Sequence, residues 1–157
     1  MTTTAPSPTP TVNGRVIALA HYAARALLEG VLDRHGLTFH QSVTLRAVAV
    51  AGGSIAREEL VRDVTGSLKA DAPAVRTVIE ELTAGQLLAD DPAEASRLRL
   101  TGAGRDRYER TTAETAEITA RLYAGIPAED LAAAGRVLAL VTERANADLA
   151  AGGGTPA

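Results

Sequence analysis

The side chains of this chain that are best suited to binding chemistry are basic or carry hydroxyl groups, and they lie between residues 57 and 99. Guanidinium and ammonium groups bind phosphate, hydroxyl groups donate to it, and an arginine can also pair with both acceptors of a guanine base. These residue types predict contact with nucleic acid, with Arg76 the best candidate for reading a base. The predicted contacts are Arg57, Thr65, Ser67, Lys69, Arg76, Thr77, Arg97 and Arg99.

Acidic side chains accompany these basic ones in the stretch KADAPAVRTVIEEL, residues 69–82. Asp71 and Pro73 suit the start of a helix, because a carboxylate caps exposed N–H groups and the first turn does not need the donor that proline lacks. Arg76 has an alternative role as the partner of Glu80, four residues further on a solvated helix face. If the stretch binds DNA, its acidity predicts weak non-specific affinity.

The composition argues against several other functions. The chain has 16 basic and 19 acidic side chains, a net charge of -3, so any basic surface must be local. It has no cysteine, which excludes disulfides and cysteine zinc sites. No phosphate-binding glycine loop, Gly-x-Ser-x-Gly elbow or metal motif is present, so we expect no enzyme and no cofactor. His21, His35 and His40 leave zinc sensing as an alternative, although they show no close pairing.

The residues around these candidates predict a mainly helical chain. Apolar positions recur at helical spacing, Thr38-x-x-Gln41 is a capping box, and Gly52-Gly53 breaks the helix that the box begins. Ser54 is then expected to cap a third helix, and residues 65–67 to form the turn before a fourth. The predicted helices span about residues 14–34, 38–50, 55–64 and 71–84.

Two short helices joined by a tight turn predict a helix-turn-helix. After Gly85, an extended arm from Leu87, a turn over residues 90–96 and the alternating Arg97-Leu98-Arg99-Leu100 predict a two-stranded hairpin, the wing of a winged helix. A long polar helix is expected over about residues 102–123. The fold class is therefore mainly α with a small β-wing.

The two ends of the chain predict a homodimer. Apolar residues of the first helix and of a last helix after Pro127 form stripes too wide for a monomer to cover. Residues 1–13 and 151–157 are expected to be flexible tails, and neither a signal peptide nor a membrane span is recognisable, so we expect a soluble cytoplasmic protein. The predicted interface residues are Val16, Ala20, Leu27, Leu131, Leu138, Val141 and Leu149.

With these elements in order, the sequence resembles the MarR (multiple-antibiotic-resistance regulator) family over residues 14–150. That family divides into dimerisation helices, here residues 14–36 and 102–150, around a winged helix-turn-helix, here 37–101. Two features depart from its pattern: the fourth helix lacks a Ser/Thr-rich start, and the wing tip Pro92-Ala93-Glu94-Ala95-Ser96 lacks Asp-x-Arg-Arg. The matching residues are Leu37, Thr38, Gln41 and Leu45, then Arg57, Glu58, Glu59 and Leu60, then Val75, Leu82 and Leu87, and finally Leu98, Leu100, Thr101, Gly104 and Arg105.

The resemblance implies a homodimeric transcriptional regulator, usually a repressor, that binds double-stranded DNA at a near-palindromic operator. It also implies release from DNA by a small-molecule effector, often phenolic or otherwise aromatic, or by a metal or oxidant. The polar groups nearest the expected effector pocket are His21, Tyr22, Arg25 and His40, and each has packing at the dimer interface as its alternative role. An interaction module that has lost specific DNA binding is the alternative function.

Overall fold

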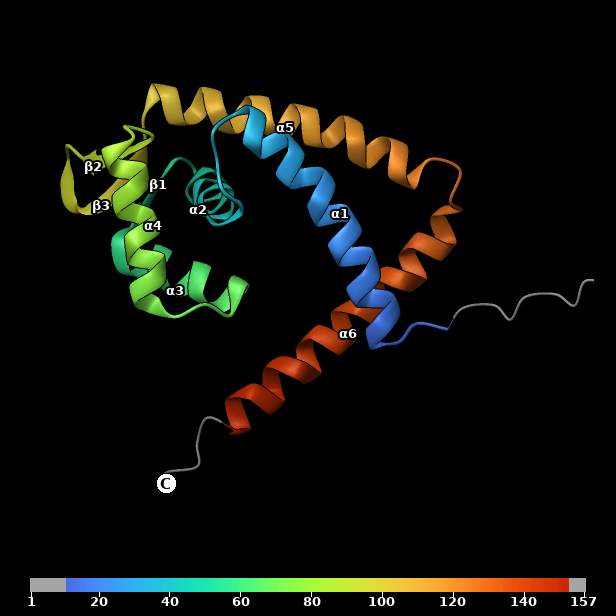
Figure 1. Ribbon diagram of the computed structural model, residues 1–157. Coiled ribbons are helices and arrows are strands. Elements are labelled where there is room, and N and C mark those ends of the chain that lie inside the picture. The colour runs from blue at the N-terminus through green and yellow to red at the C-terminus, as the bar shows by residue number, and fades with distance from the viewer. Residues whose placement is uncertain (1–10, 153–157) are drawn as a thin grey trace, which may run out of the picture. The chain divides into compact units, whose positions relative to one another are not determined.

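The structure, a computed structural model, describes residues 11–152. This part of the chain divides into two compact units, one ending at Ile118 and the other beginning at Thr119. The elements, labelled in Figure 1, are α1 (Gly14–Arg34), α2 (Phe39–Val50), β1 (Ser54–Ala56), α3 (Arg57–Leu68), α4 (Ala72–Ala84), β2 (Leu88–Asp91), β3 (Glu94–Leu100), α5 (Gly102–Tyr123) and α6 (Ala128–Gly152).

Side-chain caps fix where the first two helices begin. Asn13 accepts a hydrogen bond from the backbone of Val16 at the start of α1. Thr38 and Gln41 form both hydrogen bonds of a capping box at the start of α2. Because each cap satisfies backbone N–H groups that have no partner within the helix, these starts are determined locally. The predicted capping box is confirmed.

The core of the first unit lies among α2, α3, α4 and the small sheet. It is built from aliphatic side chains, with no aromatic residue fully buried in the described part of the chain. The small volume of these residues lets the three helices pack closely, as the low aromatic content predicts. The core residues that are least exposed include Leu32, Leu45, Val48, Leu60, Val64, Ile79, Leu82, Leu88 and Leu98.

The sheet has three antiparallel strands in the order β1-β3-β2. Ile55 of β1 pairs with Leu98 of β3, and Leu88 of β2 pairs with Leu100. These apolar residues are buried on one face, so β3 connects the wing to the core. Pro92 and Ala93 separate β2 from β3 at the wing tip.

Two predictions about the segment after α2 are wrong. Ser54 does not cap a helix; it begins strand β1, and α3 starts at Arg57 without a side-chain cap. The predicted turn at residues 65–67 is the last part of α3, which continues to Leu68, and the turn lies at residues 69–71. Lys69 makes this turn in the left-handed conformation, with φ of 54°.

The wing also differs from its prediction. The sheet contains β1 in addition to the expected hairpin, and β3 begins at Glu94, three residues before the predicted strand. The last helix continues to Gly152, so residues 151 and 152 belong to it rather than to a tail. Residues 11–13 of the predicted first tail precede α1, and Asn13 caps that helix. Residues 1–10 and 153–157 lie outside the described residues.

A tight joint connects the wing to α5. The Thr101 hydroxyl donates to the carbonyl oxygen of Gln86 at 2.6 Å and accepts a hydrogen bond from the backbone of Gly104 at 2.9 Å. Gly104 is buried against the backbone of Leu87, where a Cβ atom would overlap the carbonyl group. The Leu-Thr-x-x-Gly order at this point is thus explained by the close approach of two backbones.

The helices at the two chain ends expose many apolar side chains. Within α6 no residue is buried, and Leu138 and Val141 are 41% and 46% exposed. In the first unit, Val16 and Leu27 of α1 are 38% and 45% exposed. No helix among residues 11–152 is long and apolar enough to cross a membrane.

Candidate nucleic-acid interface

The solvent-facing side of α4 carries the side chains predicted to meet bases. The helix begins at Ala72 after its cap, so Arg76 and Thr77 lie in its second turn. Both are exposed, whereas Val75 and Ile79 face the core. Since a recognition helix contacts base edges with its N-terminal residues, this face of α4 is the geometrically suitable one.

Helix-start chemistry accounts for the first acidic residue of this stretch. The Asp71 carboxylate accepts a hydrogen bond of 2.8 Å from the backbone of Ala74, and Pro73 lies in the first turn. At the other end, Glu81 accepts a hydrogen bond of 2.9 Å from the side-chain amide of Gln41 on α2. Asp71 and Glu81 thus have roles inside the protein, and their charges are not evidence against contact with DNA.

The guanidinium of Arg76 is held by a carboxylate of the neighbouring helix. Its two terminal nitrogens donate to the two oxygens of Glu58 on α3, at 2.8 and 3.0 Å. The alternative partner proposed from the sequence, Glu80, is therefore wrong. These hydrogen bonds lower the pKa of the Glu58 carboxyl below its ordinary 4.5, and the charges of Arg76 and Arg57 act in the same direction.

The last turn of α3 offers one exposed hydroxyl group, and the turn that follows it offers one exposed ammonium group. Ser67 is exposed, and the Lys69 ammonium group donates to the carbonyl oxygen of Gly66 at 2.7 Å. Thr65 differs, because its hydroxyl oxygen is buried without a hydrogen-bond partner among the described residues. A phosphate cannot reach that oxygen in this conformation, so Thr65 is not kept among the interface residues.

The two wing arginines leave the same face of β3 but differ in environment. Arg97 is half-buried and donates to the carbonyl oxygen of Ser54 at 2.9 Å and to its hydroxyl at 3.2 Å. Arg99 is exposed. The Ser54 hydroxyl donates in turn to Asp91 at 2.8 Å. Hydrogen bonds from the Ala93 backbone and from Ser54 lower the pKa of the Asp91 carboxyl.

Arg57 connects the start of α3 to the wing. Its guanidinium donates to Asp90 of β2 at 2.8 Å; the Arg57 side chain is half-buried and the Asp90 side chain is exposed. Three arginines of the predicted interface (Arg57, Arg76 and Arg97) are thus engaged by groups of the protein itself. Sequence reasoning missed these partners, because Glu58, Asp90 and Ser54 lie 18 or more residues from the arginines that they bind.

The predicted effector residues lie on α1 and at the start of α2. Arg25 donates to Glu29 at 2.8 Å, and its guanidinium carbon lies 4.5 Å from the centre of the Phe39 ring. The rings of His21 and Tyr22 meet edge to face, 5.8 Å apart. No group of three His, Asp or Glu side chains within residues 11–152 is placed to hold a metal ion.

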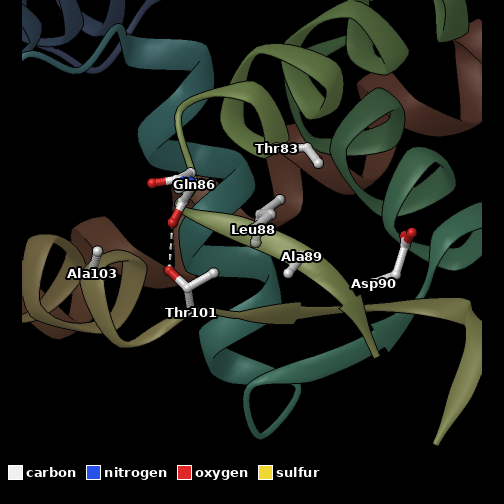
Figure 2. Close-up of a pocket in the computed structure, with 7 residues that line it drawn as sticks. All are labelled: Thr83, Gln86, Leu88, Ala89, Asp90, Thr101 and Ala103. Atoms are coloured by element: carbon white, nitrogen blue, oxygen red, sulfur yellow. Dashed lines mark hydrogen bonds between the residues drawn. The ribbon is translucent and has the colours of Figure 1, made fainter. Parts of the chain in front are cut away.

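Two hollows can be described in the first unit. One, of about 60 Å³, lies among α2, α3 and α4 and is lined by His40 together with mainly apolar side chains. The other, of about 490 Å³, is an open groove lined by the end of α4, by β2 and by the start of α5 (Figure 2). The Thr83 and Thr101 hydroxyls in this groove already donate to backbone carbonyls. His21, Tyr22 and Arg25 line neither hollow.

Comparison with solved structures identifies the fold. A MarR-family transcriptional regulator from a Rhodococcus species matches 82% of this chain and 92% of its own, with a TM-score of 0.68 and 17% identity. The chain therefore has the fold of MarR-family regulators. Bordetella bronchiseptica BpsR matches 82% of this chain and 97% of its own, at 27% identity and a TM-score of 0.65. The resemblance and the winged-helix fold class predicted from the sequence are confirmed.

Two further matches are to MarR-type proteins on DNA. Staphylococcus aureus MepR in complex with DNA matches 85% of this chain and 96% of its own, at 16% identity and a TM-score of 0.69. A mutant of Escherichia coli MarR with operator DNA matches 82% and 91%, at 19% identity and a TM-score of 0.66. No family model and no curated protein matches this sequence.

Proposed function

We propose that this protein is a homodimeric, sequence-specific DNA-binding transcriptional regulator of the MarR type. The observation that carries the proposal is the exposed second turn of α4, where Arg76 and Thr77 face solvent on a helix anchored by buried Val75 and Ile79. The wing contributes exposed Arg99 for phosphate contact. Solved MarR-type structures of the same fold include complexes with DNA.

The proposal includes dimerisation through the chain ends, because a near-palindromic operator needs two symmetric readers. What supports this part of the proposal is that α1 and α6 each expose apolar residues that a second copy could cover. Two recognition helices of one dimer then meet half-sites about 10 base pairs apart or a multiple of that spacing. We expect the protein to repress, rather than activate, transcription.

A selection experiment tests DNA recognition without knowledge of the regulated genes. The full-length protein is incubated with a random-sequence duplex library, and bound duplexes are amplified through repeated rounds. We expect enrichment of one near-palindromic motif, and weaker enrichment of that motif for Arg76→Ala. If the wild-type protein enriches no motif, the alternative of an interaction module without specific DNA binding is supported instead.

An aromatic acid is the effector class that we propose. The solved NadR structure contains 4-hydroxyphenylacetate, and the DNA binding of BpsR is regulated by 6-hydroxynicotinic acid. In this chain, Arg25 beside the Phe39 ring combines a cation for a carboxylate with an aromatic surface. His21, Tyr22 and His40 are the neighbouring polar groups on the same two helices.

Both named acids can be tested directly. We expect at least one of them to raise the melting temperature of the protein and to weaken its binding to the selected duplex. Arg25→Met should reduce both effects, because it removes the cation and keeps an apolar side chain of similar length. An effector response that is unaltered in Arg25→Met would contradict this assignment.

A further inference from the structure

Glu58 and Arg76 form a two-pronged ion pair between the two helices of the helix-turn-helix. Each carboxylate oxygen accepts from a different terminal nitrogen of the guanidinium, at 2.8 and 3.0 Å. The side chains are 70% and 46% exposed, so the pair lies at the surface. Because both prongs form at once, they fix the plane of the guanidinium as well as its position.

The pair leaves one edge of Arg76 available for a base. A guanidinium has five N–H groups, and the prongs to Glu58 use one from each terminal nitrogen. The edge made by Nε–H and the adjacent terminal N–H still presents two parallel donors. Among residues 11–152, no hydrogen bond from Arg76 Nε is formed in this structure. Two parallel donors are what the O6 and N7 acceptors of guanine accept.

The pair also changes how Arg76 responds to phosphate. A free arginine is attracted to any DNA backbone and strengthens binding to every sequence. Arg76 paired with Glu58 is close to neutral as a unit, and so adds little to sequence-independent attraction. A hydrogen bond to a base edge depends on local geometry, and pairing does not remove it.

We propose that Glu58 is a positioning residue that determines base specificity: it holds Arg76 by one edge, so that the other edge reads a guanine while the pair avoids general attraction to phosphate. This inference rests on the proposed function, since it requires that α4 meets the major groove. It gives the acidic character of the interface a role in selecting sequence.

The test is Glu58→Gln, which keeps the size of the side chain and removes its charge. Kd is measured for a duplex obtained by selection and for a duplex of the same composition in shuffled order. We expect binding to the selected duplex to weaken by about two- to fivefold, the range of an exposed ion pair. Binding to the shuffled duplex should tighten, and its dependence on salt concentration should steepen by about one released counterion.

A matched control is available in the same helix turn. Glu59 is exposed and forms no ion pair within the described residues, so Glu59→Gln makes the same change in net charge without releasing Arg76. We expect Glu59→Gln to change the Kd values for the selected and the shuffled duplex by the same factor. In an Arg76→Ala background, Glu58→Gln should behave like Glu59→Gln, because no guanidinium remains to be positioned.

Two results would overturn the proposal. One is a ratio of the two Kd values that is the same in Glu58→Gln as in the wild-type protein. The other is that Glu58→Gln binds the selected duplex more tightly, by a larger factor than it does the shuffled duplex. That result would mean that Glu58 competes with the base for Arg76. Melting temperatures of the Gln variants exclude misfolding as a cause. If the wild-type protein does not distinguish the two duplexes, the proposed function itself fails, and that failure is seen before any variant is measured.

Discussion

Replacing Gly104 by alanine should break the joint between the wing and α5. A Cβ atom at this position would lie 2.9 Å from the carbonyl carbon of Leu87 and would overlap its oxygen. The obstacle is backbone and cannot rotate away as a side chain would. The same carbonyl accepts a hydrogen bond of 3.1 Å from the backbone of Thr101, so moving it also disturbs the connection that begins α5.

The expected loss is about 3 kcal/mol of unfolding free energy, at the upper end of what an overpacked site loses. The sign itself is informative, because alanine in place of glycine inside a helix normally stabilises by about 0.5–1 kcal/mol. Gly102 provides the comparison two residues away. A Cβ atom there would meet nothing within 4 Å, and its backbone is not in the left-handed region.

Urea denaturation followed by circular dichroism measures both variants. We expect Gly104→Ala to lower the urea concentration at the midpoint strongly. Gly102→Ala should leave the free energy of unfolding unchanged or raise it by up to about 1 kcal/mol. Equal stability of the two variants would refute the argument that a backbone contact, rather than helix propensity, requires glycine at position 104.

Three further predictions concern the helix cap, the dimer and pH. Asp71→Ala should cost about 1 kcal/mol in urea denaturation whereas Asp71→Asn keeps most of the cap, and equal losses would contradict capping. Leu138→Asp should give a monomer in sedimentation; an intact dimer would place the interface elsewhere. Hydrogen bonds from Arg34 and His35 lower the pKa of Glu114 below its ordinary 4.5. The contribution of the ionised Glu114 is therefore present above that value and is lost as pH falls through the lower folded pKa. Glu114→Gln should accordingly reduce the fall in stability between about pH 6 and about pH 3, and an unchanged pH profile would contradict this contribution.

The parts of the fold that depend on local chemistry were predictable from the sequence. The capping box at Thr38 and Gln41 and the Asp71 cap of α4 each satisfy backbone groups within a few residues, and Pro73 lacks the N–H donor that would have no partner in the first turn. The spacing of apolar residues in α3 and α4 likewise identifies the faces that pack in the core, because helical periodicity can be read from nearby positions. These features require no knowledge of distant partners.

The errors occur where distant segments decide the structure. Strand β1 has three residues, too few to show alternation, and it exists because it pairs with β3 more than 40 residues later. Gly66 between two hydroxyl residues is typical of a turn, yet Val64 and Leu68 on either side of it pack against the core, and the helix continues to Leu68. The turn then uses Lys69 in a left-handed conformation for which the sequence gives no signal.

The candidate interface was predictable in residue type but not in arrangement. Arg76 was expected on the exposed face of α4, and it lies there. The partner of Arg76 depends on how α3 crosses α4. This crossing places Glu58 within hydrogen-bond distance of Arg76, which therefore does not pair with Glu80, although Glu80 is closer in the sequence. The acidity of this surface therefore has to be interpreted pair by pair.

The central claim, sequence-specific DNA recognition through α4, is tested most directly by one ratio of affinities. Fluorescence anisotropy at near-physiological salt compares the selected duplex with its shuffled counterpart for the full-length protein. We predict that the selected duplex binds about a thousandfold more tightly or better, and that Arg76→Ala lowers this preference at least about tenfold. Equal affinity of the wild-type protein for the two duplexes would contradict the account.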